Sequence, residues 1–269
     1  MHVRKNSRLL VFSALAGALL FLGQATAGEL TEKFDKTFHL QQGGRFTLQN
    51  ANGAIHVATW DREEVRVEAE KRVHGGSREV AERLLRETEI LVEATGAEVR
   101  VDTRTPHSEG HGFWSWLFDG GGGDIEVIYW ITLPKRTTTQ LASTNGMVEV
   151  RDVVGSCDVR TTNGRIVVED IAGGLRAETT NGSIELRLMD TQDTADLTLE
   201  TTNGSITATL PASFAGWVSA KTTNGGIRSD FPVTIERRHQ KNHLEGKVGE
   251  GKMRFHAKTT NGSIRLLKS

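Results

Sequence analysis

The chain has 269 residues, of which 37% are apolar and 25% are charged, and its formal net charge is -1. This balance excludes an intrinsically disordered chain and gives no electrostatic reason to expect a nucleic acid as partner. The single cysteine, Cys157, excludes an internal disulfide and any site built from several thiolates, and we expect its thiol to be buried. Glycine is unusually frequent, at about 11% of the chain against about 7% in average proteins.

The first 27 residues have the layout of a secretory signal peptide. A basic start is followed by an apolar run from Leu9 to Leu22 and by the small residues Ala25-Thr26-Ala27. This order predicts cleavage after Ala27, and the apolar run is shorter than the roughly 20 residues of a transmembrane helix. No later stretch is long and apolar enough to span a bilayer. We therefore expect an exported chain without a transmembrane span after cleavage, in the periplasm or at the surface or outside of a bacterium.

The next part of the chain predicts a body made of strands. Residues 28–39 form an N-terminal lead, and residues 40–134 are expected to form the first rungs of this body. Short segments in which apolar and polar residues alternate predict strands at 46–48, 54–57 and 65–69.

One helix is predicted at residues 77–91. Ser77 is a suitable N-cap, and the apolar residues from Val80 to Ile90 give roughly one apolar face. Residues 92–103 then alternate as another strand. We expect the helix to pack against the first rungs or to cap them.

Residues 105–124 interrupt the strand pattern with a cluster of large apolar side chains between flexible flanks. The cluster precedes four glycines at 120–123 and consists of Phe113, Trp114, Trp116, Leu117 and Phe118. An exposed cluster of this kind is costly unless it contacts something, and aromatic residues often anchor interfaces. Two interpretations stay open: the loop contacts a partner, or it folds back and caps the open end of the body. It is the best candidate for a functional contact.

The strongest signal in the chain is a repeated tetrapeptide. Thr-Thr-Asn-Gly occurs five times, a sixth copy begins at Ser143, and a degenerate seventh lies at 51–57. Successive asparagines are 18, 18, 22, 21 and 37 residues apart, and self-similarity with a period near 20 residues is typical of solenoids. The structural corners that the repeat predicts are Asn145, Gly146, Asn163, Gly164, Asn181, Gly182, Asn203, Gly204, Asn224, Gly225, Asn261 and Gly262.

One period shows what each unit contains. In residues 159–174, alternation at Val159 and Thr161 and again at Ile166 and Val168 predicts two short strands. Asn-Gly separates them at a corner where a positive φ is cheap, and Gly-Gly forms the opposite corner. Antiparallel hairpins are the competing interpretation, but they give no reason for the same four residues to recur. We therefore predict an all-β fold, a single-stranded β-solenoid with short Asn-Gly-cornered rungs and one helix in its N-terminal part.

Residues 135–269 are expected to form the repeat β-solenoid, continuous with the preceding part. Stacked corners would place asparagine over asparagine, so that their side chains can bond along the stack. The 37-residue step from Asn224 to Asn261 predicts an expanded rung, with a glycine-rich turn at 246–251. A short strand at 264–266 is expected to cap the solenoid, because an uncovered last rung would offer an open edge.

Several of these features together resemble the bacterial putative-adhesin family, whose core is a domain of unknown function. An Asn-Gly-x-Ile strand is followed by Trp60 and a strand at 65–67, residues 131–135 lead into serial Thr-Asn-Gly-x-Ile rungs, and Phe-Pro-Val at 231–233 precedes the final rung. The resemblance covers about residues 35–269 and implies an exported β-solenoid. In many relatives an aspartate follows Asn-Gly, and here that place holds Met147, Arg165, Ser183, Ser205, Gly226 and Ser263.

The remaining patterns argue against a catalytic or metal site. The sequence has no Gly-x-Ser-x-Gly, no His-Glu-x-x-His and no phosphate loop. His107 and His111, like His239 and His243, offer two ligands without a third. We therefore predict no catalytic residue, no metal and no cofactor. The corner rows of Thr and Asn could form a flat surface for glycan or ice, but turn chemistry favours a structural role.

The leading hypothesis is a non-enzymatic, adhesin-like structural or interaction module of the cell envelope, whose partner is an unknown envelope component, either protein or glycan. The alternative is a polysaccharide-active enzyme that uses acidic residues on the solenoid face. It is motivated by Glu149, Glu169 and Glu185, which we interpret as occupying comparable places after the Asn-Gly corner. Self-association through the end rungs is a third hypothesis.

Overall fold

The computed structural model describes residues 29–106, 123–191, 194–235 and 242–269. The predicted signal peptide and the apolar cluster at 113–118 lie outside the described residues, as do His107, His111 and His239.

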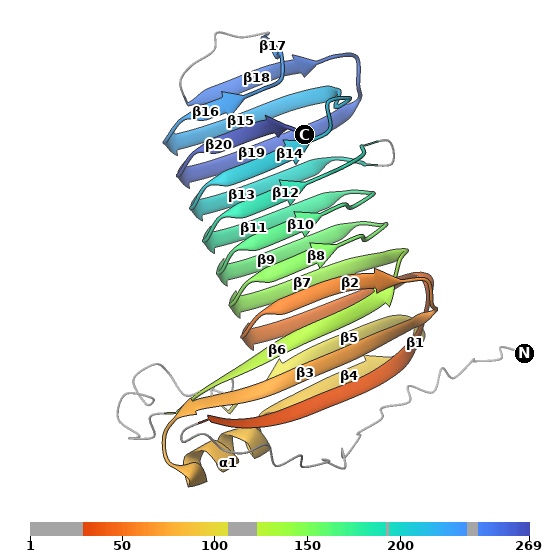
Figure 1. The fold of residues 1–269 in the computed structure, drawn as a ribbon, viewed down its shortest axis with the longest axis vertical. Helices are drawn as coiled ribbons and strands as arrows, with labels where there is room; N and C mark the ends of the chain where they lie inside the picture. The colour runs from red at the N-terminus through yellow and green to blue at the C-terminus, as the bar shows by residue number, and fades with distance from the viewer. Residues whose placement is uncertain (1–28, 107–122, 192–193, 236–241) are drawn as a thin grey trace, which may run out of the picture.

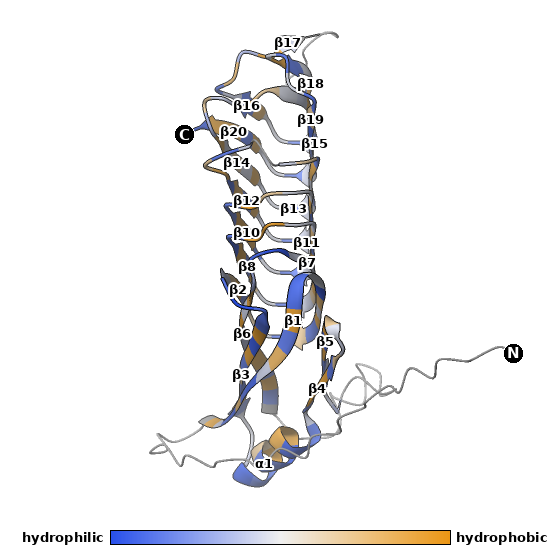
Figure 2. Ribbon diagram, turned by 90° about the vertical axis from the view of Figure 1, so that its right-hand side faces the viewer, coloured by the Kyte–Doolittle hydropathy of each residue, from blue (hydrophilic) through white to orange (hydrophobic). Residues whose placement is uncertain are grey.

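The described residues form a tall stack of strands arranged as two sheets that face each other (Figures 1 and 2). The pairings give the order of strands in sheet A as the first half of β1 (Glu29–Asn52), β3 (Glu64–Gly75), β6 (Gly123–Pro134), β2 (Ile55–Trp60), β8 (Val148–Arg151), β10 (Ile166–Glu169), β12 (Ile184–Arg187), β14 (Ile206–Leu210), β20 (Ile264–Lys268) and β16 (Ile227–Ser229). The order in sheet B is β4 (Glu89–Ala94), β5 (Gly96–Arg104), the second half of β1, β7 (Thr137–Asn145), β9 (Cys157–Asn163), β11 (Leu175–Asn181), β13 (Leu197–Asn203), β19 (Met253–Asn261), β15 (Gly216–Asn224), β18 (His243–Val248) and β17 (Thr234–Ile235). The prediction of an all-β solenoid with one helix is confirmed.

Each rung from β7 to β14 consists of a strand in sheet B, an Asn-Gly corner, a strand in sheet A and a second corner. Parallel pairing keeps the rungs in register, so that Asn163 lies over Asn145 and Ile184 over Ile166. Buried and outward residues alternate along each strand, and inward residues such as Val159 and Ile166 have no exposed surface. The core is therefore a column of apolar side chains between the two sheets, and burying each large one contributes about 1.5–3 kcal/mol.

The helix α1 (Arg78–Glu87) is shorter than the sequence predicts. It begins after the N-cap Ser77, whose hydroxyl accepts from the Val80 N–H, and it ends at Thr88. Residues 89–94 form β4 and not the end of the helix, because they pair with β5 across a turn at Gly96, which has a φ of +81°. The helix contacts β1, β3 and β6 and covers the lower end of the stack in Figure 1.

The last rung in sequence is not the last rung in space. β19 pairs with β13 on one side and with β15 on the other, and β20 lies between β14 and β16. The prediction that the final strand caps the solenoid is therefore wrong. The antiparallel strand β18, together with β17, occupies the far side of β15, and the chain then returns to the level between the two preceding rungs (Figure 1).

Glycine is required at the stacked corners because successive rungs approach closely there. A Cβ atom on Gly182 would lie 1.9 Å from the carbonyl oxygen of Gly164, and one on Gly204 would lie 1.9 Å from that of Gly182. The positive φ expected from the sequence occurs at Gly146, at +143°, but not at Gly164, Gly182 or Gly204. The repeat therefore preserves glycine chiefly for steric reasons.

Gly182→Ala should lower the free energy of unfolding by at least about 2 kcal/mol, because the added methyl group meets backbone and not a movable side chain. Gly226→Ala is the matched control, since a Cβ there has nothing within 4 Å, and its effect should stay within about 0.5 kcal/mol. Urea unfolding of both variants measures the difference. Equal losses would contradict the steric explanation.

Candidate functional site

The corner asparagines form a ladder of side-chain amides along one edge of the solenoid. Each Nδ2 donates to the Oδ1 of the asparagine in the rung below, at 2.7–2.8 Å, in the order Asn224, Asn261, Asn203, Asn181, Asn163 and Asn145. The order follows the stack and not the chain, because Asn261 lies between Asn203 and Asn224. The amides are therefore used mainly to bind one rung to the next.

The two threonines of each corner have different environments. The first is buried, and its hydroxyl donates to the carbonyl oxygen of a corner glycine in the rung below: Thr179 to Gly164 at 3.1 Å and Thr201 to Gly182 at 2.9 Å. The second points outward from sheet B, and Thr180 is exposed. The first threonine satisfies the backbone at the corner, whereas the second is available to solvent.

The outward threonines border a shallow groove of about 460 Å³ on the outer face of sheet B. Threonine side chains of successive rungs line one side of the groove, and charged side chains line the other side. The residues of the charged side are Arg160, Glu178, Glu200 and Lys258, and those of the threonine side include Thr162, Thr180, Thr202 and Thr260. No aromatic ring lines the groove, so it offers hydroxyl and charged groups alone.

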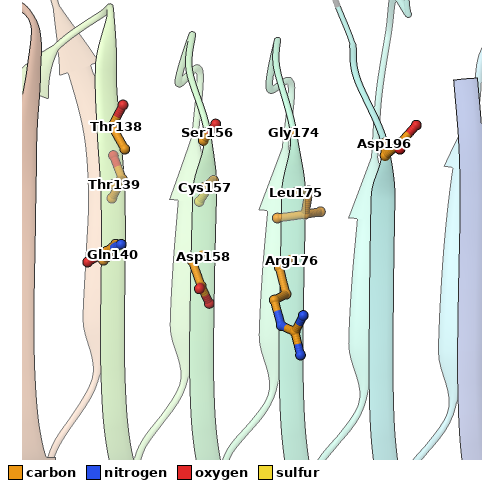
Figure 3. Close-up of a pocket in the computed structure, with 10 residues that line it drawn as sticks. All are labelled: Thr138, Thr139, Gln140, Ser156, Cys157, Asp158, Gly174, Leu175, Arg176 and Asp196. Carbon is orange, nitrogen blue, oxygen red and sulfur yellow. The ribbon is translucent and has the colours of Figure 1, made fainter.

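A second hollow, of about 330 Å³, lies on the same face nearer the opposite corners (Figure 3). It forms where Gly174 contributes no side chain between Ser156 of the rung below and Asp196 of the rung above. Asp158 and Arg176 border it, and Oδ1 of Asp158 is buried without a hydrogen-bond partner. The hollow is therefore lined by both polar and apolar groups and open on one side, and it does not enclose a ligand.

Between the two hollows the charged side chains pair with one another. Arg160 contacts Asp158 at 2.9 Å and Glu178 at 3.2 Å, and Arg176 also contacts Glu178. Hydrogen bonding to Glu178 raises the pKa of Arg176. Exposed pairs of this kind contribute little to stability because solvent screens them, so their main effect is to neutralise the charge of the face.

The row of acids that motivated the enzyme hypothesis is not a row. Glu149 and Glu185 are both in register with position 167, which is Val167, whereas Glu169 pairs in register with Arg151. The sequence count failed because Glu169 lies two residues further from its corner than the other two. Each acid also has a basic neighbour: Arg151 contacts Glu149 and Glu169, and Arg165 contacts Glu185 at 3.2 Å. The three acids therefore do not form the row on which the enzyme hypothesis depends.

The sequence interpretation missed a small aromatic cluster on the outer face of sheet A. Trp130 is 38% exposed and stacks on His56 at 6.2 Å between ring centres. Nδ1 of His56 is 2.8 Å from Oε2 of Glu149. Alternation along residues 125–131 was the signal that could have found it, since the pattern that buries Tyr129 turns Trp130 outward.

The described residues include no group of three or more His, Cys, Asp or Glu side chains that could hold a metal ion. In the same part of the chain, no helix is long and apolar enough to cross a membrane.

Cys157 lies beneath the second hollow, and its side chain belongs to the core of the solenoid. Its side chain belongs to the inward row of β9 and the residue is 2% exposed. Burial raises the pKa of its thiol from an ordinary value of 9.0 to about 12. Since only the thiolate is nucleophilic, the folded chain holds this cysteine in an unreactive form.

The structure thus defines a class of protein, a parallel β-solenoid. On its described outer faces several charged side chains form ion pairs, and the hollows are open to solvent. The chain belongs to the Toastrack DUF4097 family, which it matches over residues 117–267. The resemblance to the putative-adhesin family is confirmed.

Two solved structures similar to the chain carry related names. A putative cell adhesion protein from Clostridium sporogenes is 11% identical, with a TM-score of 0.51 over 88% of this chain and 100% of that one. A putative adhesin from Bacteroides fragilis is 8% identical, with a TM-score of 0.40 over 88% of this chain and 97% of that one. At this identity the first similarity is one of fold. A search of the curated proteins finds no match.

Thr179→Val should lower the free energy of unfolding by about 1–2 kcal/mol, because it leaves the Gly164 carbonyl without its side-chain donor. Thr180→Val makes the same change on the adjacent exposed residue and should cost less than about 0.5 kcal/mol. Chemical unfolding of the two variants tests the assignment of roles, which a larger loss at Thr180 would contradict.

Cys157 should react with a maleimide at least about a hundredfold more slowly in the folded chain than in the denatured chain. The raised pKa also has a consequence at high pH. Between about pH 9 and pH 12 the unfolded chain releases a proton that the folded chain keeps, so stability should fall as the pH rises through this window. Labelling followed by mass spectrometry checks the first expectation, and rapid native labelling at neutral pH would contradict it.

Proposed function

We propose that the chain is an exported, non-enzymatic interaction module of a bacterial envelope. The observation that carries the proposal is the character of the described faces, where several charged groups pair with each other and the hollows are open to solvent. Such a surface suits contact with an extended partner better than enclosure of a small substrate, since small-molecule sites are concave and largely apolar. The names of the two similar structures agree with an adhesin-like role.

The solenoid would serve this role as a rigid support. Parallel rungs add roughly 4.8 Å each, and every rung is bound to the next by backbone pairs and by the amide ladder. A body of this kind holds its two ends at a fixed separation, which is useful for presenting a contact away from an attachment point.

The contact that we propose is the apolar cluster of residues 113–118. The strands that flank the loop bring its ends to the α1 end of the stack, since Arg104 is in register with Glu89 and Gly123 with Gly75, and α1 lies between these two partners in the chain. The cluster contains two of the chain's five tryptophans. Aromatic residues are enriched among the side chains that dominate binding energy at interfaces.

Replacing Phe113, Trp114, Trp116 and Phe118 by Ser should weaken binding of the mature chain to isolated envelope material by at least about tenfold, with an unchanged unfolding midpoint. A matched control replaces Thr162, Thr180 and Thr202 by Ser on the groove of sheet B and should bind normally. Sedimentation of the purified chain with envelope fractions measures both.

Four outcomes would contradict parts of the proposal. Unchanged binding of the folded loop variant would overturn the loop's role, and a large loss of stability would assign it to capping the stack. Loss of binding in the control alone would move the contact to sheet B. Reproducible cleavage of an envelope polysaccharide by the purified chain would overturn the non-enzymatic assignment.

A further inference from the structure

The backbone N–H groups of the corner glycines follow one rule with one exception. In the stack, each corner glycine donates its N–H to the backbone oxygen of the asparagine in the rung above. The pairs are Gly146 to Asn163 at 3.0 Å, Gly164 to Asn181 at 3.0 Å, Gly182 to Asn203 at 3.0 Å, Gly204 to Asn261 at 2.9 Å and Gly262 to Asn224 at 3.1 Å. Gly225 is the corner glycine of the top rung, and among the described residues its N–H has no acceptor.

Asn-Gly is also a reactive sequence. The backbone nitrogen of the glycine can attack Cγ of the asparagine side chain, because glycine has no Cβ to hinder the approach. The new N–C bond closes a five-membered imide and ammonia leaves. Water then opens the imide at either carbonyl and gives aspartate or isoaspartate, so the only reagents are the chain and water.

The stack opposes this reaction at the interior corners in two ways. The attacking nitrogen must give up its N–H···O bond to the rung above, and the asparagine side chain must leave the amide ladder. At Asn181, for example, Nδ2 donates to Asn163 while Oδ1 accepts from Asn203, both at 2.8 Å. Attack therefore requires local opening of the stack, and reactions that require opening are slowed by its free energy.

Neither protection is complete at the top corner. Asn224 keeps its bond to Asn261 at 2.7 Å, but no described residue donates to its Oδ1. Gly225 is the one exposed glycine among the six stacked corners, and the other five are half-buried. Asn145, at the other end of the ladder, also has one ladder bond, but the Gly146 N–H is bonded to Asn163. Among the described corners, only the top one therefore combines an unbonded glycine N–H with a side chain held by a single ladder bond.

We propose that Asn224 is a site of spontaneous deamidation and that conversion proceeds down the stack in spatial order. Loss of the amide removes the donor that Asn224 provides to Asn261. An isoaspartate also adds a backbone atom to the corner whose oxygen accepts from Gly262. The corner at Asn261 then becomes the freest one and reacts second, although Asn203 precedes both residues in the chain.

The test is peptide mapping by mass spectrometry of the folded mature chain during incubation in mildly alkaline buffer below its unfolding temperature. Asn224 should deamidate at least about tenfold faster than Asn163, Asn181 or Asn203, and Asn261 should follow Asn224. The interior corners are internal controls with the same Asn-Gly chemistry. The same chain in denaturant gives the intrinsic rates, which differ with the residue after glycine: Gly226 after the top corner, Arg165 after Asn163-Gly164, and Ser after the other three.

A second variant separates order from coincidence. Asn224→Gln blocks the five-membered imide at the top corner and should slow the deamidation of Asn261 to the rate of the interior corners. The proposal would be overturned by equal folded-state rates at Asn224 and the interior corners, or by a ranking that persists unchanged in denaturant. Deamidation of Asn261 at its original rate in the variant would overturn the spatial order.

Discussion

The distance between stacked backbones at the Asn-Gly corner is the constraint on which the rest of the molecule depends. Parallel pairing brings successive rungs to the hydrogen-bonding separation, and at the corner the chain turns with the α-carbon of one glycine against the carbonyl oxygen of the next. Because that place accepts no Cβ, glycine recurs there. Because the corner has one shape, the asparagine and the first threonine of each rung meet the same partners. The sequence repeat therefore exists because the same contact between corners recurs in successive rungs.

The same uniformity explains the topology of the C-terminal part. A corner that fits against Gly204 from above and against Gly225 from below is interchangeable with any other corner, so the stack accepts the last rung at an interior level. The two rungs on either side, β13–β14 and β15–β16, leave one rung of space between them, and β19–β20 fills it. The chain end is consequently held by pairs on both sides, while β17, β18 and the corner at Asn224 form the upper end of the stack.

These contacts also show what the sequence can and cannot predict. The solenoid was predictable because steric exclusion at the corner leaves a visible residue pattern. The level of the last rung was not, because identical corners carry no information about their order, and Asn203, Asn224 and Asn261 look the same in the sequence. The end of α1 was missed because residues 88–91 continue the apolar face, and pairing with β5 decides their conformation. The predicted row of acids is wrong for a related reason. Residues in sheet A are in register only when they lie the same number of residues after their Asn-Gly corner, and Glu169 lies two residues further than Glu149 and Glu185.

The use of polar groups inside the stack limits where function can lie. Inward threonines and corner amides are occupied by the neighbouring rungs, and several outward charges on both sheets pair with a charge of opposite sign. The groups that remain available on the described surface include the outward threonines, the hollow beside Gly174, Trp130 with His56, and the exposed side chain of Met189. Polar groups that are bonded within the stack make the solenoid rigid, but they are not available to bind a partner. For this reason we propose the segment between β5 and β6 as the contact, since its aromatic composition is unlike that of any rung.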